Sequence, residues 1–180
     1  MSNNNKTKAI FFDRDGVINK VIFRENKISS PWRLEEFEII PQVRDILLEF
    51  QDFLKIVFTN QPDVSRGNLA IEELEKMHKL LLEKLPIDDI EYCIHDDHHN
   101  CSCRKPKPGL LFQAAEKYNI DLSNSYVVGD SWKDIKAGKA AGCKTILIRT
   151  EYNKDYFDDY DFEVSQLKEI VEIIKKLDKK

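Results

Sequence analysis

Short apolar runs rich in β-branched residues alternate with longer amphipathic runs over most of the chain. The apolar runs have the length of strands, and the amphipathic runs have the period of helices. The predicted strands are residues 8–13, 54–60, 90–95, 125–130 and 144–149. The predicted helices are residues 42–50, 71–85, 108–119, 131–142 and 164–180. Because strands that are apolar throughout need cover on both faces, this order predicts an α/β fold, a Rossmann-like parallel sheet with helices on both faces.

The length and composition favour one soluble domain. A chain of 180 residues fits a single domain over residues 1–180, with a polar N-terminal tail at 1–7. No apolar run approaches the ~20 residues that span a bilayer, and the N-terminus lacks the apolar stretch of a secretory signal. A net charge of −4 disfavours nucleic acid as a partner. We therefore expect a cytoplasmic monomer without a membrane or nucleic-acid partner.

Polar side chains stand where several of the predicted strands end. Asp13 and Asp15 follow the first strand, Thr59 and Asn60 close the second, and Asp130 ends the fourth. Ligands of parallel sheets bind beyond the carboxyl ends of the strands, so we expect these residues to meet at one rim. A simpler interpretation stays open, because Asp, Gly, Thr and Asn are also favoured in turns for backbone reasons alone.

Three carboxylates at one rim repel one another unless a cation lies between them. Oxygen ligands with tight geometry favour magnesium, so Asp13, Asp15 and Asp130 form the predicted magnesium site. The ion would also offset the repulsion between a carboxylate and a phosphate dianion, roughly 8 kcal/mol at about 4 Å. Arg104 or Lys105 would neutralise the remaining phosphate oxygens.

Two polar residues at the start of the 131–142 helix are assigned a supporting role. Ser131 is a candidate N-cap, and Asp134, three residues later, favours the helix dipole. Asp134 is also a candidate for orienting the ion through a water molecule.

Three of the four cysteines lie close to one histidine in the sequence. Cys93 and His95, followed after a short gap by Cys101 and Cys103, supply three sulfurs and one imidazole. This is a closed tetrahedral set of zinc ligands, so the predicted zinc is structural and stabilises the loop at about 93–103. By its position the zinc would fix the residues that directly follow Cys103, beside the phosphate site.

Other interpretations of this cluster stay open. The cysteines can be a group of reduced thiols without metal, and His98 or His99 can replace His95 as the fourth ligand. The remaining cysteine, Cys143, is interpreted as an ordinary buried thiol.

Four motifs in order carry a family resemblance: "FFDRDGVIN" (11–19), "VFTNQ" (57–61), "CRKPKPG" (103–109) and "VVGDSWKD" (127–134). They resemble the motifs of the haloacid dehalogenase phosphatase superfamily over about residues 8–150. The "DRDG", "TNQ" and "CxCRKP" forms resemble the subgroup of the heptose-bisphosphate and histidinol phosphatases, in which the same knuckles bind zinc.

The resemblance implies a role for each motif residue. Asp13 would be the nucleophile that forms an aspartyl-phosphate, and Asp15 the general acid that protonates the leaving alcohol and then activates water. Magnesium would be held by the Asp13 carboxylate, the Asp15 main-chain carbonyl and Asp130. The implied substrate-binding residues are Thr59, Asn60, Gln61, Arg66, Arg104 and Lys105.

The motifs narrow the substrate without fixing it. "RKPKPG" and "TNQPDVSRG" resemble the heptose-bisphosphate enzymes, whereas the short gap between His95 and Cys101 resembles the histidinol enzymes. Residues 20–36 are longer than the corresponding heptose loop, and Arg66 can equally be a solvated loop residue. We expect a small phosphorylated sugar, first a heptose bisphosphate and second histidinol phosphate or another small ester, at an open site without a large cap domain.

Two functions outside enzymology fit the sequence less well. A phospho-receiver domain would place its acceptor aspartate at the end of a middle strand, where this chain has "TNQ". A zinc-binding interaction module would account for the cysteines but not for Asp13, Asp15 and Asp130.

Overall fold

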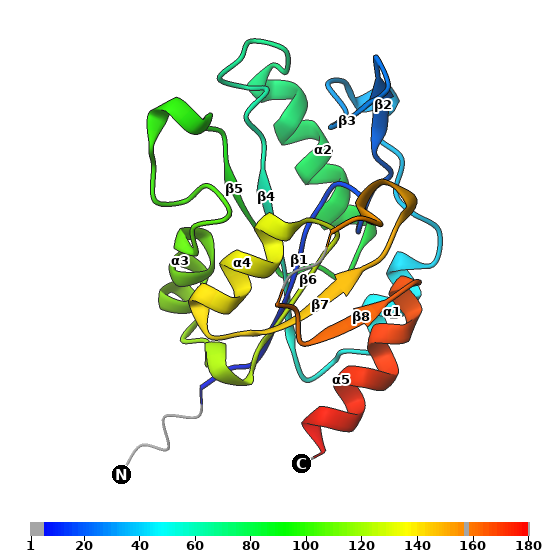
Figure 1. Ribbon diagram of the computed structural model, residues 1–180, viewed down its shortest axis with the longest axis vertical. Helices are drawn as coiled ribbons and strands as arrows, with labels where there is room; N and C mark the ends of the chain where they lie inside the picture. Colours follow the sequence, from blue (N-terminus) through cyan, green and yellow to red (C-terminus); the bar gives the residue numbers. More distant parts are fainter. Residues whose placement is uncertain (1–5, 157–158, 180) are drawn as a thin grey trace.

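Residues 6–156 and 159–179 are described by the computed structural model, drawn as a ribbon in Figure 1. A six-stranded sheet forms its centre, with the order β5-β4-β1-β6-β7-β8, and every neighbouring pair is parallel. The strands are β1 (Ala9–Phe12), β4 (Leu54–Asn60), β5 (Asp89–Cys93), β6 (Tyr126–Gly129), β7 (Lys144–Ile148) and β8 (Phe162–Val164). The parallel sheet predicted from the sequence is confirmed, and β1 lies in its middle.

Helices cover both faces of the sheet (Figure 1). One face packs against α1 (Val43–Leu48), α2 (Ile71–Lys84) and α5 (Ile170–Asp178), and the other against α3 (Gly109–Tyr118) and α4 (Trp132–Ala141). Alternate residues of β1 supply the two cores: Ile10 and Phe12 belong to the first, Ala9 and Phe11 to the second. The alternation follows from the period of two in a strand.

Short single-turn helices fill several of the connections. They are η1 (Leu34–Glu36), η2 (Asp97–His99), η3 (Leu122–Asn124), η4 (Glu151–Asn153) and η5 (Leu167–Glu169). Among the described residues, no helix has both the length and the apolar character required to cross a bilayer.

The local signals at α4 are confirmed. The Ser131 hydroxyl accepts a hydrogen bond from the main-chain N–H of Lys133, while Asp134 accepts one from the N–H of Ser131. Gly142 ends the helix with a φ of 81°, a left-handed conformation that glycine adopts without steric cost. These contacts fix where α4 begins, directly after Asp130.

Two segments differ from the sequence prediction. Residues 20–36 contain an antiparallel hairpin, β2 (Ile22–Arg24) and β3 (Lys27–Ser29), which turns at Glu25 and Asn26, both with positive φ. The helix predicted over 164–180 is wrong at its start, because Val164 belongs to β8, which pairs with β7, and α5 begins at Ile170. A strand of three residues is too short to show a period of two, so the helical pattern that follows masked it.

Candidate active site

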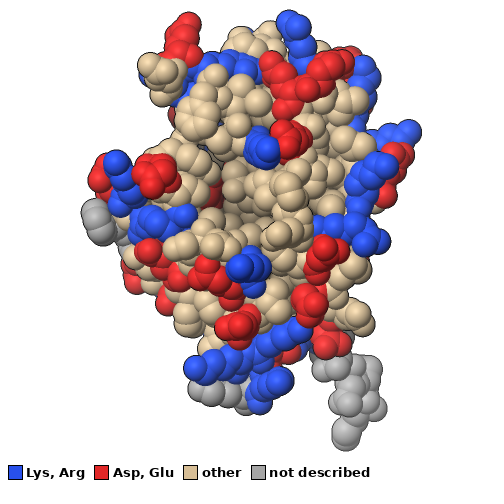
Figure 2. All heavy atoms as spheres, turned by 90° about the vertical axis from the view of Figure 1, so that its right-hand side faces the viewer, with Lys and Arg blue, Asp and Glu red and all other residues tan. Residues whose placement is uncertain are grey.

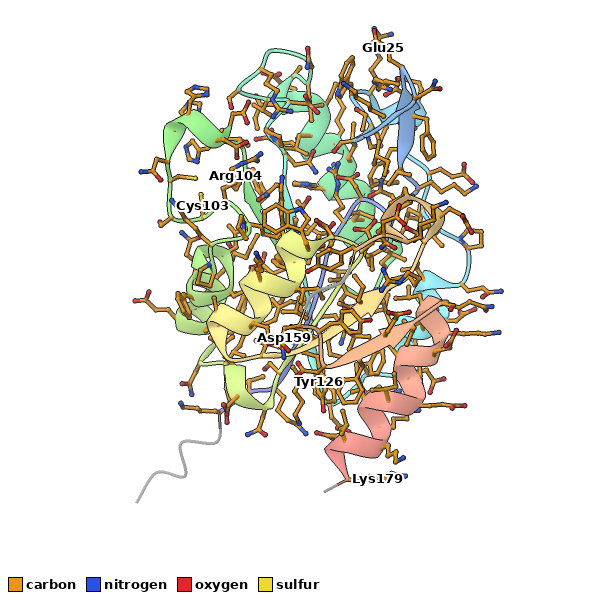
Figure 3. All side chains as sticks on the ribbon, viewed as in Figure 1. Glu25, Cys103, Arg104, Tyr126, Asp159 and Lys179 are labelled. Carbon is orange, nitrogen blue, oxygen red and sulfur yellow. The ribbon has the colours of Figure 1, made fainter. Side chains whose placement is uncertain are left out.

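A cavity of about 690 Å³ opens beyond the carboxyl ends of β1, β4 and β6. Its lining includes Asp13, Asp15, Asp130 and Asp134, as well as residues from the β2–β3 hairpin and from η4. In Figure 3, Arg104 and Cys103 lie in the upper part of the molecule, whereas Tyr126, at the start of β6, lies in the lower part. The carboxyl ends of the strands bring Asp13 and Asp15 close to Asp130 and Asp134, although more than a hundred positions separate the two pairs in the sequence.

Lys105 is the cation at the centre of this acidic cavity. Its Nζ lies 2.7 Å from Oδ1 of Asp13 and 2.6 Å from Oδ1 of Asp134, and it donates to the carbonyl of Phe58 at 3.0 Å. The Lys105 side chain is almost fully buried. Burial opposes its charge, but the two carboxylates outweigh that effect and raise the pKa of Lys105. Lys105 therefore stays protonated while it bridges the two acids.

Asp13, Asp130 and Asp134 form a cluster of carboxylates. They offer oxygens that all lie within 4.8 Å of one another, and all three residues are buried. Burial first, and then the charge of Asp134, raise the pKa of Asp13 well above its ordinary value. The same two causes raise the pKa of Asp130 to about 7. A single lysine does not balance three buried acids, so the cluster has the donor type and the excess negative charge of a divalent-metal site.

The position of Asp15 differs from the expected trio of carboxylates. The carboxylate that joins Asp13 and Asp130 is that of Asp134, not that of Asp15. The Asp15 carboxylate is held by four side-chain donors, from Arg14, Asn19, Ser30 and Gln61. Burial raises its pKa, but Arg14 and the hydrogen bonds outweigh burial, so the pKa of Asp15 is lowered. Asp15 still lines the cavity beside Asp13.

Three consecutive residues at the end of β4 have distinct partners. Thr59 lines the cavity, and its hydroxyl accepts a hydrogen bond from the Gln61 amide at 2.9 Å. The Asn60 side chain pairs with the main chain of Lys105 in both directions, at 3.0 Å each. Gln61 also donates to Asp15 at 2.7 Å. Asn60 and Gln61 thus use their side chains to hold Lys105 and Asp15 in place.

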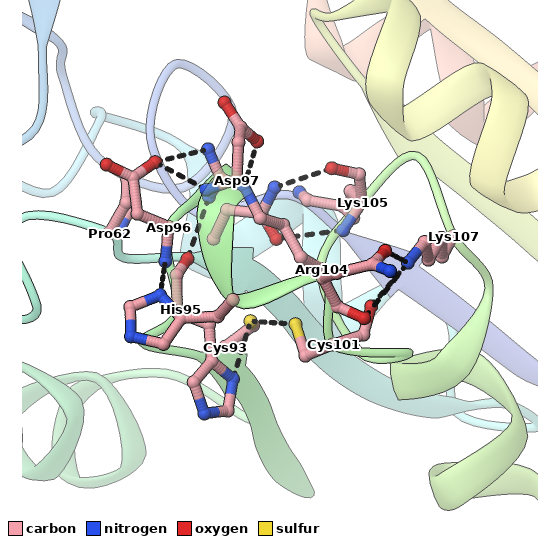
Figure 4. A network of polar contacts seen from close by, with 12 residues as sticks. Pro62, Cys93, His95, Asp96, Asp97, Cys101, Arg104, Lys105 and Lys107 are labelled. Carbon is pink, nitrogen blue, oxygen red and sulfur yellow. Dashed lines mark hydrogen bonds and ion pairs between the residues drawn. The ribbon is translucent and has the colours of Figure 1, made fainter.

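The four predicted zinc ligands come together at the end of β5 and in the loop that leads to α3. Figure 4 shows three of them, Cys93, His95 and Cys101. The sulfurs of Cys93, Cys101 and Cys103 lie 3.1 to 3.6 Å apart, and Nδ1 of His95 lies 3.5 and 3.6 Å from two of them. Zinc bonds of about 2.3 Å to sulfur and 2.0 Å to nitrogen give tetrahedral edges of about 3.5 to 3.8 Å. The sulfur–nitrogen distances match these edges and two of the three sulfur–sulfur distances are shorter, so the four atoms converge closely enough to bind one ion of the size of zinc.

The alternative histidine ligands are placed elsewhere. Nδ1 of His99 accepts a hydrogen bond from the main-chain N–H of Asp96, and the ring of His98 packs against that of His99 with centroids 3.9 Å apart. Of the histidines in the described chain, only His95 joins the three cysteines in a group that could hold a metal. Cys143 is buried in the core on the α3 and α4 face, as expected.

Two arginines of the cavity lining form ion pairs with acids of the loop between β5 and α3, and Figure 4 shows one of them, Arg104. Arg104 donates to Asp97 at 2.7 Å and to the carbonyl of His95 at 3.2 Å. Arg66 makes a bidentate pair with Asp96, at 2.6 and 2.8 Å. Both arginines line the cavity, so the loop that holds the cysteines also sets the position of two positive charges at the site.

Sequence reasoning missed several cavity residues. The structure adds Tyr152 and Asn153 from η4, and Ile28 and Ser30 from the hairpin region. Ser30 reaches Asp15, and Tyr152 donates a hydrogen bond to Asp130. Neither segment carries a motif; the one available signal was that residues 19–42 are long for a connection between a strand and a helix.

An aspartate directly after the central strand β1, two further acids after β6 and a buried lysine that pairs with Asp13 and Asp134 are the arrangement of a haloacid dehalogenase-like hydrolase. Residues 102–170 match the family model described as HAD-hydrolase-like. The D-glycero-alpha-D-manno-heptose-1,7-bisphosphate 7-phosphatase of Campylobacter jejuni is 32% identical over 96% of this chain and 99% of its own. The chain therefore belongs to the heptose-bisphosphate phosphatase family of these hydrolases.

Two further relatives extend the comparison. The D-glycero-beta-D-manno-heptose-1,7-bisphosphate 7-phosphatase of Helicobacter pylori (strain 26695) is 34% identical over 80% of this chain and 84% of its own. The crystal structure of D,D-heptose 1,7-bisphosphate phosphatase from B. bronchiseptica, complexed with magnesium and phosphate, superposes with a TM-score of 0.80. That structure is 27% identical and covers 95% of this chain and 99% of its own.

Proposed function

We propose that this protein is a magnesium-dependent phosphatase that removes the 7-phosphate of D-glycero-D-manno-heptose 1,7-bisphosphate. The observation that supports this substrate is the similarity, over nearly the full length of both chains, to the heptose-1,7-bisphosphate 7-phosphatase of Campylobacter jejuni, with 32% identity. The cavity of about 690 Å³ is large enough for a sugar bisphosphate. On the face drawn in Figure 2, acidic and basic side chains are interspersed around a central hollow, which supports a small substrate over a polyanion.

The carboxylate cluster fits magnesium. Asp13 and Asp130 would hold the ion with the main-chain carbonyl of Asp15, and Asp134 lies close enough to join them directly or through water. When bound, the ion neutralises the acids and the phosphoryl oxygens, which otherwise repel each other. In the described part of the chain, the cluster is the one all-oxygen group of this kind.

Asp13 is the proposed nucleophile. Its Oδ1 accepts hydrogen bonds from the main-chain N–H of Arg14 at 2.8 Å and from Lys105 at 2.7 Å. These donors hold Oδ1, so we assign attack on phosphorus to Oδ2. The attack forms the Asp13–phosphoryl bond and breaks the bond to the sugar oxygen, while Lys105 and Thr59 bind the phosphoryl oxygens.

Asp15 is the proposed proton-transfer group. It donates a proton to the departing sugar oxygen, and it then takes one from the water that hydrolyses the aspartyl-phosphate. In the structure Arg14, Asn19 and Gln61 lower the pKa of Asp15, which suits the second step. A phosphoryl dianion beside it raises that pKa by repulsion, which favours the protonated form needed in the first step.

The Cys93, His95, Cys101 and Cys103 group is the proposed structural zinc site. All four ligand positions are filled by side chains, so no position is open for catalysis. The proposed effect on the reaction is indirect, because Arg104 and Lys105 directly follow Cys103. Arg104 and Lys133 line the cavity and supply positive charge for the second phosphate of the substrate.

A phosphate-release assay tests the substrate. The panel contains both anomers of the heptose 1,7-bisphosphate, the heptose 1-phosphate, histidinol phosphate and a hexose 6-phosphate, with Asp13→Asn as the inactive control. We expect the highest kcat/KM on one anomer of the bisphosphate and no release from the 1-phosphate. A higher kcat/KM on histidinol phosphate would overturn the substrate and leave the reaction class standing.

A further inference from the structure

The turn that follows β7 is fixed to the main chain of Asp130. The Asn153 side chain donates to the carbonyl of Asp130 at 2.7 Å and to the carbonyl of Ile148 at 2.8 Å. It also accepts a hydrogen bond from the N–H of Thr150 at 2.8 Å. Arg149 also stabilises this turn, because its guanidinium donates hydrogen bonds to the carbonyls of Asn153 and Tyr156 at 2.8 Å each. The turn is therefore a firm support placed directly beside the acid that ends β6.

This turn carries Tyr152 onto the side chain of Asp130. The Tyr152 hydroxyl donates a hydrogen bond to Oδ2 of Asp130, and the ring forms part of the cavity wall. Both atoms pack against Gly16: a Cβ at that position would lie 2.0 Å from Oδ2 of Asp130 and 2.6 Å from the Tyr152 oxygen. Gly16 has a φ of 94°, so the loop after Asp15 closes over this hydrogen bond because it has no side chain there.

We infer that Tyr152 is a positioning residue for the metal site: its hydroxyl holds Oδ2 of Asp130 so that Oδ1 is presented to magnesium. The inference rests on the proposed metal dependence. A carboxylate with two equivalent free oxygens can rotate and bind an ion through either or both of them. A fixed donor on one oxygen removes that freedom, so less conformational entropy is lost when the ion binds.

The test is a calorimetric titration of magnesium chloride into the full chain without substrate. The protein is dialysed against magnesium-free buffer without a chelator, which leaves the cysteine cluster undisturbed. We expect Tyr152→Phe to raise the Kd for magnesium about 10-fold, as the loss of an outer hydrogen-bond partner does at metal sites. The kcat of Tyr152→Phe should fall more at a magnesium concentration near the parental Kd than at saturating magnesium, because the hydroxyl acts through the ion.

Tyr118→Phe is the matched control. It also removes a hydroxyl that donates to an aspartate, Asp89, but at the C-terminal end of α3 and outside the lining of the cavity. Its magnesium Kd should equal that of the parent. Thermal melts of both variants without magnesium show whether a change in Kd comes from the site or from loss of fold, and we expect melting temperatures equal to the parent.

The outcomes separate this inference from the proposed function. An unchanged magnesium Kd in Tyr152→Phe overturns the inference. If kcat at saturating magnesium falls while the Kd is unchanged, the hydroxyl acts on the substrate and not on the metal site. Absence of magnesium binding by the parent overturns both. A raised Kd in Tyr152→Phe, together with a parent that does not hydrolyse the heptose bisphosphate, supports the inference and rejects the substrate alone.

Discussion

Nζ of Lys105 lies 2.7 Å from Oδ1 of Asp13, although 92 positions separate the two residues in the chain. Asp13 is placed by the central strand β1, whereas Lys105 is placed by the loop that also holds the cysteine cluster. The charge balance at the site therefore depends on the fold of a loop that is itself polar and has little apolar core.

Lys105→Met should lower the free energy of unfolding by about 3–5 kcal/mol, because it leaves Asp13 and Asp134 buried without their cation. Urea denaturation at pH 7 in magnesium-free buffer measures the loss. Adding Asp134→Asn to Lys105→Met should recover part of it. Lys117→Met, which breaks exposed pairs with Asp89 and Glu91, is the control and should cost less than about 1 kcal/mol. Equal losses in the two lysine variants would contradict the assigned burial of charge.

Asp13→Asn should reduce kcat by more than about 10⁴-fold, since an amide oxygen cannot form the phosphoryl bond. Asp134 repels the charge of Asp13 and still pairs with Lys105 in the variant, so the neutral amide should not lower the melting temperature. Steady-state kinetics and a thermal melt check both expectations. Asp52→Asn, at an exposed position, serves as the control with parental turnover. Substantial turnover by Asp13→Asn would remove Asp13 from the nucleophile's role.

The purified protein should contain one zinc per chain, measured by elemental analysis. Cys101→Ser should lose the metal and melt at a lower temperature, because the β5–α3 loop then lacks its cross-link. Cys143→Ala removes a thiol outside the cluster and should retain the zinc. If Cys101→Ser keeps a full complement of zinc, the four-ligand assignment is wrong.

Because of His78, the free energy of unfolding should decrease as the pH is lowered below about 6.5. Burial first, and then Arg14, lower the pKa of His78 to about 3, so it stays neutral in the folded protein. Between those two values the unfolded chain binds one proton more than the folded protein. Stability is therefore complete above the unfolded pKa and declines by about 1.4 kcal/mol per pH unit as the pH falls.

The measurement for His78 is urea denaturation at pH 7 and pH 5. His78→Gln should show a drop between the two that is smaller by about 2 kcal/mol than the parent's. The exposed His98 provides the control: His98→Gln should keep the parental drop. An identical pH dependence in all three proteins would exclude His78 as the source.

The sequence was informative wherever an element exceeded a few residues. The five predicted strands all occur, and the range 54–60 agrees with β4 at both ends. The parallel order then placed Asp13, Thr59 and Asp130 at one rim, as observed. Patterns of this kind depend on the backbone period, which the amino-acid order records directly.

Side-chain contacts that depend on the three-dimensional fold could not be predicted from the sequence pattern in the same way. The sequence prediction placed the Asp15 carboxylate in the magnesium site with Asp13 and Asp130, but β1 ends at Phe12 and the chain then turns. Asp15 accordingly pairs with Arg14, while Asp134 takes its place in the cluster. Tyr152 reaches Asp130 from a turn without regular pattern, so no periodicity marked it.

The β2–β3 hairpin contributes Ile28 to the lining of the cavity, and its Glu25–Asn26 turn is exposed. Because it shares no strand pairing with the main sheet, it can be lengthened, shortened or grafted from another protein without breaking a ladder that holds the carboxylates. Changes in the hairpin can therefore alter which substrates enter the cavity while the catalytic residues stay the same.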